Sequence, residues 1–146
     1  LAEDSLRVFC MCLTYGRGLF RSEDEFADYI GSKYAVAVSN GTAALHLCTL
    51  ALGVKEQDKV ITTPITFAAS ANCVRYCGGE VVFADIDVET KLLDINDCLR
   101  KITKNTKVIM PVHLYGNLFN TKKLRTFVKK KFQTNFVLNK FFFLNK

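Results

Sequence analysis

The stretch from Tyr34 to Leu52 constrains the fold most, because it joins a strand, a tight turn and a helix. Residues 34–38 (YAVAV) are mostly strand-forming, and residues 39–42 (SNGT) are typical of a turn. Ala43 begins a run of strong helix formers that is apolar nearly all round. We therefore expect this helix to be buried rather than amphipathic.

The turn at residues 39–42 also predicts an anion-binding site. The first amides of a helix have no acceptor within the helix, and they lie at the positive end of its dipole. Gly41 lets a ligand approach the backbone closely, and Thr42 adds a hydroxyl group. A phosphate fits such a site, but an ordinary strand-to-helix turn has the same composition. Both interpretations stay open at this point.

The rest of the chain alternates between strands and helices. Ser22 and Glu25 form a capping box, and Gly31 is typical of a helix end. The expected helices are 22–30, 67–76 (capped by Thr66), 95–102 (capped by Asp94) and 122–131, and the expected strands are 59–62, 80–84 and 107–112. Residues 1–20 show no dominant period and suggest at most a short helix. The alternation predicts an α/β fold with a mainly parallel sheet covered by helices on both faces.

Polar residues gather where the expected strands end. Four such clusters occur, at residues 39–42, 63–67, 85–87 and 113–117. Ligands of parallel sheets bind beyond the carboxyl ends of the strands, so these clusters are expected at one edge of the sheet. Polar loops follow strands in any protein, and some of this convergence therefore needs no functional explanation.

Length, cysteine content and apolar patterning narrow the class of protein. A chain of 146 residues can form one domain with its own core. It has no apolar run long enough to span a bilayer and no signal peptide, so we expect a cytoplasmic protein without a membrane segment. The six cysteines form no CxxC pair. We expect buried reduced thiols and no metal site.

The net charge of +6 is unevenly distributed. Residues 121–146 contain eight Lys or Arg and no acidic residue, whereas residues 1–120 contain twelve basic and fourteen acidic residues, a balance of −2. The segment 121–146 also holds half of the twelve Phe. It is either a basic, aromatic surface for nucleic acid or an incidental sequence, such as out-of-frame translation of an A/T-rich gene. The second interpretation is favoured, and we do not expect binding of nucleic acid.

Three segments in the middle of the chain carry a family resemblance. They are FADYIGSKYAVAVSNGTAALHL, TPITFAASANCVRYCGGEVVFADID and KVIMPVHLYGN, in that order. Together they resemble the DegT/DnrJ/EryC1/StrS family of pyridoxal-phosphate (PLP) sugar aminotransferases, which have the aspartate aminotransferase type I fold. Within the family, the sequences of these segments are most similar to enzymes that aminate nucleotide-linked 4-keto-6-deoxy sugars, including the pseudaminic-acid branch. The resemblance covers roughly two-thirds of the chain.

The resemblance implies roles for four residues around the cofactor. Gly41, Thr42 and Ala43 would hold the phosphate of pyridoxal 5′-phosphate through backbone N–H groups and the Thr42 hydroxyl. This agrees with the anion site expected from the turn itself. Phe67 would stack on the pyridine ring, and the alternative is that it only packs in the core.

Two further residues are implied near the entrance of the active site. His113 and Tyr115 would line the substrate, and for His113 a structural or substrate-lining role is favoured over acid–base work. Asp85 and Asp87 receive no catalytic role, and Asp87 is expected to cap a turn. The resemblance assigns no metal ligand.

The resemblance also implies residues for which this sequence shows no counterpart. These are the Schiff-base lysine that lies well beyond the HLYG loop and the aspartate that pairs with the pyridine nitrogen. No catalytic residue is therefore assigned. The expected organisation is an altered segment at 1–20, a partial PLP-binding large domain at 21–120 and the basic segment at 121–146. The resemblance therefore implies a truncated or frame-disrupted aminotransferase, which we expect to be inactive alone.

The intact family member would be a homodimer that transfers an amino group, from glutamate, to a nucleotide-linked keto sugar. The alternative for this chain is a non-catalytic module that binds phosphate or PLP, or that pairs with a full-length partner. A nucleic-acid binder that uses the basic segment is the less favoured third hypothesis.

Overall fold

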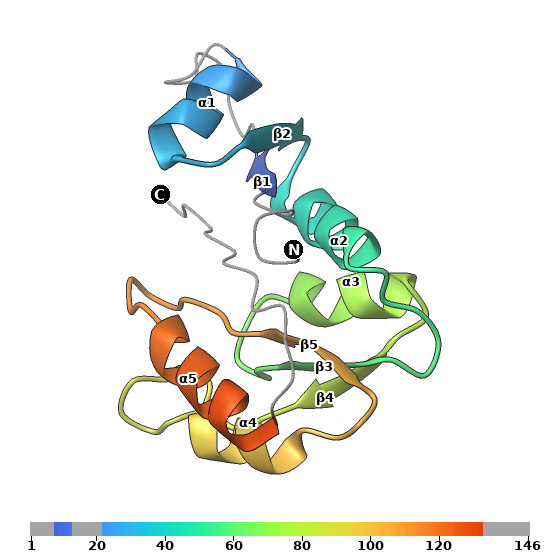
Figure 1. Cartoon of the computed structure of the whole chain (residues 1–146), viewed down its shortest axis with the longest axis vertical. Helices are drawn as coiled ribbons and strands as arrows, with labels where there is room; N and C mark the ends of the chain where they lie inside the picture. Colours follow the sequence, from blue (N-terminus) through green and yellow to red (C-terminus); the bar gives the residue numbers. More distant parts are fainter. Residues whose placement is uncertain (1–7, 13–21, 133–146) are drawn as a thin grey trace.

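The computed structural model describes residues 8–12 and 22–132, which alternate between strands and helices along the chain (Figure 1). The elements are β1 (Val8–Cys12), α1 (Glu23–Ile30), β2 (Tyr34–Val38), α2 (Gly41–Ala51), β3 (Lys59–Thr62), α3 (Ala69–Tyr76), β4 (Glu80–Phe83), α4 (Ile95–Lys101), β5 (Thr106–Met110) and α5 (Thr121–Phe132). The predicted α/β class with parallel strands is confirmed. Within the described ranges, no helix has the length and apolar character needed to cross a membrane.

The described strands form two separate parallel sheets. A three-stranded sheet has the order β4-β3-β5, and β2 pairs with β1 in a sheet of two strands. The strand β1 contradicts the expectation of at most a short helix near the beginning of the chain. The reason is that β1 is defined by its pairing with β2, from Val8 opposite Tyr34 to Cys12 opposite Val38, and no local period reveals such a distant partner.

Helices cover both faces of the three-stranded sheet, as predicted (Figure 1). Strand residues alternate between the faces, so Val60 joins a core with residues of α2 and α3, whereas Ile61 joins a core with residues of α4 and α5. Val108 and Ile109 of β5 divide in the same way. The polar loops after these strands are therefore carried by a framework that is packed on two sides.

The ends of the helices follow local capping chemistry with one exception. The Ser22 hydroxyl accepts the Glu25 N–H at 3.1 Å, and Gly31 adopts φ +67° at the other end of α1. The expected helix at 67–76 begins later, at Ala69. The Thr66 hydroxyl lies 3.3 Å from the Ser70 hydroxyl and makes no cap, so Phe67 belongs to the loop before α3.

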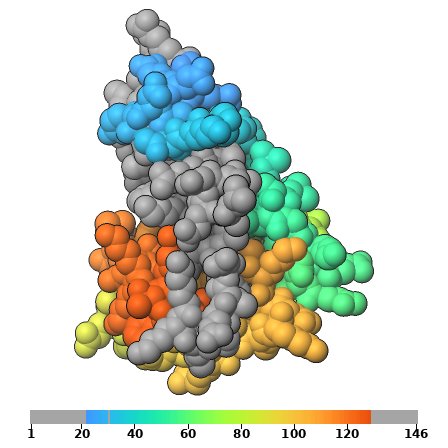
Figure 2. All heavy atoms as spheres, in the orientation of Figure 1, coloured from blue at the N-terminus to red at the C-terminus, as the bar shows by residue number. Residues whose placement is uncertain are grey.

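Helix α2 is less buried than its composition predicts. Ala44, Leu45 and Thr49 are buried, but Leu47 is 45% exposed and Leu50 is 49% exposed. The prediction of a fully buried helix is wrong for this chain, because α2 packs on the sheet and α3 along one side only. Its other side forms part of the outer surface in Figure 2.

Replacement of Gly79 by alanine is expected to destabilise the fold. A Cβ at Gly79 would lie 2.7 Å from Val54 Cγ1 and 2.9 Å from Val74 Cγ1, and both valines are buried. We expect a loss of about 1–3 kcal/mol in the free energy of unfolding, measured by urea denaturation. The double variant with Val54→Ala should recover part of this loss, since it removes the nearest methyl group. An unchanged urea midpoint for Gly79→Ala would contradict the packing described here.

Candidate functional site

Asn40 organises the turn that leads from β2 into α2. Its backbone is extended, and its side-chain Oδ1 accepts the N–H of Ala43 at 2.8 Å. The Ala43 amide, one of the three predicted phosphate donors, is therefore already hydrogen-bonded within the turn. Gly41 and Thr42 are the first two residues of α2, where an amide has no acceptor within the helix. These two amides and the Thr42 hydroxyl are the donors best placed for an anion.

The charge at the start of α2 favours a negatively charged ligand. The first turn of α1 contains Glu23, Asp24 and Glu25, whose carboxylates complement its dipole. The first turn of α2 contains no acidic residue. Gly41 and Thr42 are partly exposed, so an anion can approach them from solvent.

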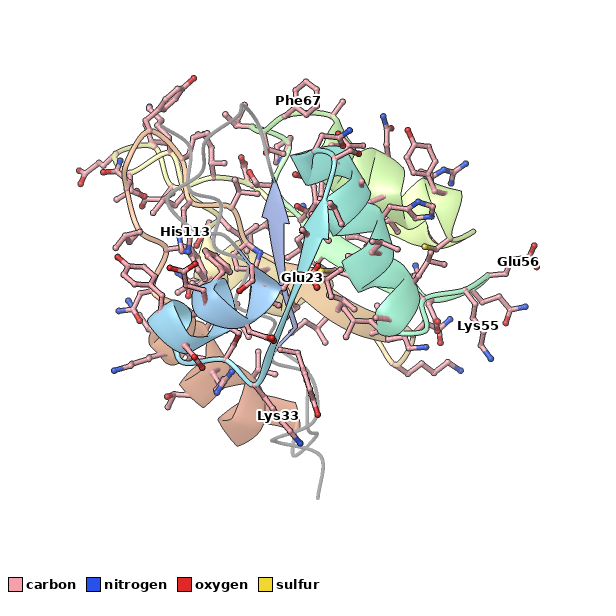
Figure 3. The ribbon with its side chains drawn as sticks, turned by 90° about the horizontal axis from the view of Figure 1, so that it is seen from above. Glu23, Lys33, Lys55, Glu56, Phe67 and His113 are labelled. Atoms are coloured by element: carbon pink, nitrogen blue, oxygen red, sulfur yellow. The ribbon has the colours of Figure 1, made fainter. Side chains whose placement is uncertain are left out.

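Phe67 lies in the loop between β3 and α3 with its side chain directed outward. The residue is 77% exposed, so its ring does not pack in the core that the described residues form. In Figure 3 the ring stands at the end of the molecule towards which β1 and β2 point and at which α2 begins. The loop before it is held by the Thr63 hydroxyl, which accepts the Ile65 N–H at 3.3 Å. Phe67 therefore presents a flat apolar surface on the same side as the start of α2.

His113 follows β5 and serves as a hydrogen-bond acceptor. Its Nδ1 accepts the N–H of Phe119 at 2.8 Å, which requires an imidazole with no proton on Nδ1. Burial lowers the pKa of His113, which favours the neutral ring that this hydrogen bond requires. This geometry gives His113 a structural role, one of the two roles that the sequence favoured over acid–base work. Tyr115, two residues further on, is 87% exposed with φ +51°.

Asp85 and Asp87, which follow β4, form hydrogen bonds that hold their own loop and its contact with α4. Asp87 Oδ1 accepts the backbone N–H groups of Glu89 and Thr90, at 3.2 and 2.8 Å, and the Thr90 hydroxyl. The hydrogen bonds from Thr90 lower the pKa of Asp87. The backbone N–H of Asp85 donates to Asp97 Oδ2 at 2.7 Å. Asp87 thus caps a turn, as expected, and the loop 85–94 is a support for the neighbouring loops.

Asp97 is the supporting residue that sequence reasoning missed. It is 8% exposed and forms ion pairs with Lys101 at 2.8 Å and Arg100 at 3.1 Å. The spacing of these partners, three and four residues after the aspartate, was the available signal.

The cysteines and possible metal ligands give no second site in the part of the chain that the structure describes. Cys73 and Cys98 are buried, and Cys48 and Cys77 are partly buried. Burial raises the pKa of Cys73, and it raises the pKa of Cys98 to about 12, so both thiols stay protonated. Among the described residues, no three His, Cys, Asp or Glu side chains gather in a way that could hold a metal ion.

Residues 11–132 match the family model of the DegT/DnrJ/EryC1/StrS aminotransferases. The GDP-perosamine synthase of Vibrio cholerae is 44% identical over 110 residues, and that of Caulobacter vibrioides is 47% identical over 113 residues. Each match covers 75% of this chain and 30% of the relative. The chain thus spans less than a third of the length of these relatives.

Two solved structures show the same fold. The chain resembles NtdA of Bacillus subtilis with bound cofactor PMP, with a TM-score of 0.70 and 34% identity over 74% of this chain and 25% of that one. It also resembles DesV of S. venezuelae in complex with a ketimine intermediate, with a TM-score of 0.70 and 33% identity over 74% of this chain and 29% of that one.

Proposed function

The chain belongs to the DegT/DnrJ/EryC1/StrS aminotransferase family, and from this premise we propose that the start of α2 binds the phosphate of pyridoxal 5′-phosphate. The family is one of aminotransferases, and solved structures that resemble this chain contain PLP or PMP, among them one from Streptococcus pneumoniae in its PLP form. The single observation that carries the proposal is the first turn of α2, which offers two amides and the Thr42 hydroxyl and contains no acidic residue. When bound, the cofactor supplies an electron sink for amino-group transfer.

The residues of this chain would bind and orient the cofactor. Amide donors at a helix start favour an anion by about 0.3–1 kcal/mol through the helix dipole, and each charge-assisted hydrogen bond adds about 1.5–3 kcal/mol. Asn40 fixes the turn by accepting the Ala43 N–H, and Gly41 and Thr42 stand at the start of α2, where an amide has no acceptor within the helix. The exposed ring of Phe67 would cover one face of the pyridine, which excludes water from that face.

The substrate proposed for the whole enzyme is a nucleotide-linked keto sugar that receives an amino group from glutamate. This is supported by relatives named for such chemistry, which include GDP-perosamine synthases and a UDP-2-acetamido-2-deoxy-3-oxo-D-glucuronate aminotransferase. We further propose that the whole enzyme is a homodimer. His113 and Tyr115 would lie on the substrate side of the site, at the loop after β5.

We propose that the lysine that attaches the cofactor covalently belongs to the part of the whole enzyme that this chain does not match. The chain matches about 30% of the length of its relatives, and no lysine of the described residues is assigned to the cofactor. We therefore expect the isolated chain to be inactive and to bind the cofactor weakly. Borohydride fixation of PLP to one specific lysine of this chain would contradict that expectation.

Replacement of Thr42 by alanine tests the proposed phosphate site. We expect the dissociation constant for pyridoxal phosphate to rise about tenfold, because a hydroxyl donor to a charged group is lost. Binding can be followed by the absorbance of the cofactor, with inorganic phosphate as a competitor. Thr126→Ala is a matched control on the exposed side of α5 and should leave the affinity unchanged. Equal affinities of native chain and Thr42→Ala would contradict the site.

A further inference from the structure

The loop after β5, residues 113–119, is held by three hydrogen bonds. His113 Nδ1 accepts the Phe119 N–H at 2.8 Å. The Asn117 N–H donates to the Leu114 carbonyl at 2.9 Å, which closes a tight turn. The Asn117 side chain donates to the Thr90 carbonyl at 3.2 Å and so ties this turn to the loop after β4. These three hydrogen bonds fix the backbone on both sides of the exposed residues 115–118.

The turn inside this loop contains an unfavourable residue. Tyr115 and Gly116 are its two central residues, with φ +51° and +80°. Such a turn favours Asn or Gly at both positions, because a side chain with a bulky Cβ substituent is strained at positive φ. Tyr115 is 87% exposed, so no core packing of its ring against the described residues offsets the strain. Strain of this kind persists where surrounding bonds impose it, and it is found at functional sites.

We propose that His113 is a positioning residue, which holds Tyr115 in the left-handed conformation so that its ring can stack on the base of the nucleotide-linked substrate. The inference rests on the proposed function in one respect, namely that the carboxyl edge of the sheet is the substrate side. An exposed aromatic ring is a general stacking surface for a nucleobase. The hydrogen bond to Phe119 requires an unprotonated Nδ1, which also argues against a role of that atom as an acid.

Two variants of His113 separate its acceptor function from its bulk. His113→Leu fills similar space but has no acceptor, whereas His113→Asn retains an acceptor oxygen bonded to Cγ, where Nδ1 is bonded in histidine. His46→Leu is the control, because His46 contacts Tyr76 edge-on at 5.3 Å between centroids and lies on α2. All three changes are compared with the native chain.

The first readout is the conformation of Tyr115 by nuclear magnetic resonance. A residue with positive φ shows a strong nuclear Overhauser effect between its own amide and Hα protons. We expect this signal in the native chain, in His113→Asn and in His46→Leu, and its loss in His113→Leu. Amide exchange at Phe119 should be at least about tenfold faster in His113→Leu. Persistence of both signals in His113→Leu would overturn the inference.

The second readout is ligand contact, with GDP as the probe for the base. GDP should shift the Tyr115 ring resonances in the native chain and bind about tenfold more weakly to His113→Leu, with recovery in His113→Asn. In parallel, pyridoxal phosphate should shift the amides of Gly41 and Thr42. If pyridoxal phosphate shifts those amides but GDP leaves Tyr115 unchanged, this inference is wrong and the proposed function stands. If neither ligand shifts any of these resonances, the proposed function is wrong, and the stacking role of Tyr115 is wrong as well.

Discussion

Replacement of Leu124 by alanine should lower the free energy of unfolding by about 2–5 kcal/mol, because it empties a fully buried position. Leu124 is 0% exposed and belongs to the core on the α5 side of the three-stranded sheet. Ile61, Ile109 and Val128 are members of the same core cluster and border the space that the leucine would leave. Urea denaturation followed by circular dichroism gives the change directly.

The matched control for this prediction lies on the same helix. Phe127 is 42% exposed, so Phe127→Ala should cost much less than Leu124→Ala although it removes a larger side chain. Equal small effects for both variants would show that α5 is not packed on the sheet. The comparison therefore tests whether the basic segment after residue 120 contributes to the domain.

The helix in this segment could be predicted, but its packing could not. Leu124 and Val128 lie four residues apart, which is a helical spacing, and a helix was expected at 122–131. The surrounding lysines give the segment a composition that suggests a solvated or incidental sequence. Burial of Leu124 depends on a contact with β3 and β5, which are distant in sequence. The interpretation of residues 121–146 as an incidental sequence stays a prediction, and residues 133–146 lie outside the described residues.

Elements were predicted well where their determinants are local. Asp94 caps α4 by accepting the Asn96 N–H at 2.8 Å, and the strand at 59–62 was predicted with its observed bounds. The strand β1 was missed because only its pairing with β2 defines it. The start of α3 was placed too early because the Thr66 hydroxyl pairs with Ser70 instead of capping the helix.

The same distinction applies to the candidate site. The donors at Gly41 and Thr42 belong to one turn and one helix, so the sequence predicts them directly. The use of the Ala43 amide by Asn40 is also local, but a capping residue and a phosphate can use the same donor, so the sequence did not show that Asn40 accepts this N–H. The role of His113 depends on the path of the loop that returns Phe119 to its Nδ1.

Replacement of Asp97 by asparagine should lower the free energy of unfolding at neutral pH. The variant should also lose less of this free energy than the native chain when the pH falls. Contacts with Lys101, then the Asp85 N–H and Arg100, lower the pKa of Asp97 from 3.8 to about 2. A carboxylate with a lowered pKa stabilises the fold above its unfolded-state pKa, and this contribution is lost as the pH falls from about 4 to about 2. The pKa difference corresponds to about 2 kcal/mol at neutral pH.

The physical reason for this loss is that one carboxylate supports the end of β4 in two ways. It accepts the Asp85 N–H directly, and it pairs with Lys101, whose Nζ also donates to the Phe83 carbonyl at 2.8 Å. Asparagine can still accept one N–H but cannot pair with the ammonium group. Unfolding free energies from urea titrations between about pH 2 and pH 7 measure the effect, with Asp28→Asn on the exposed side of α1 as the control. Parallel pH profiles for the native chain and Asp97→Asn would show that this carboxylate does not hold the loop that supports the site.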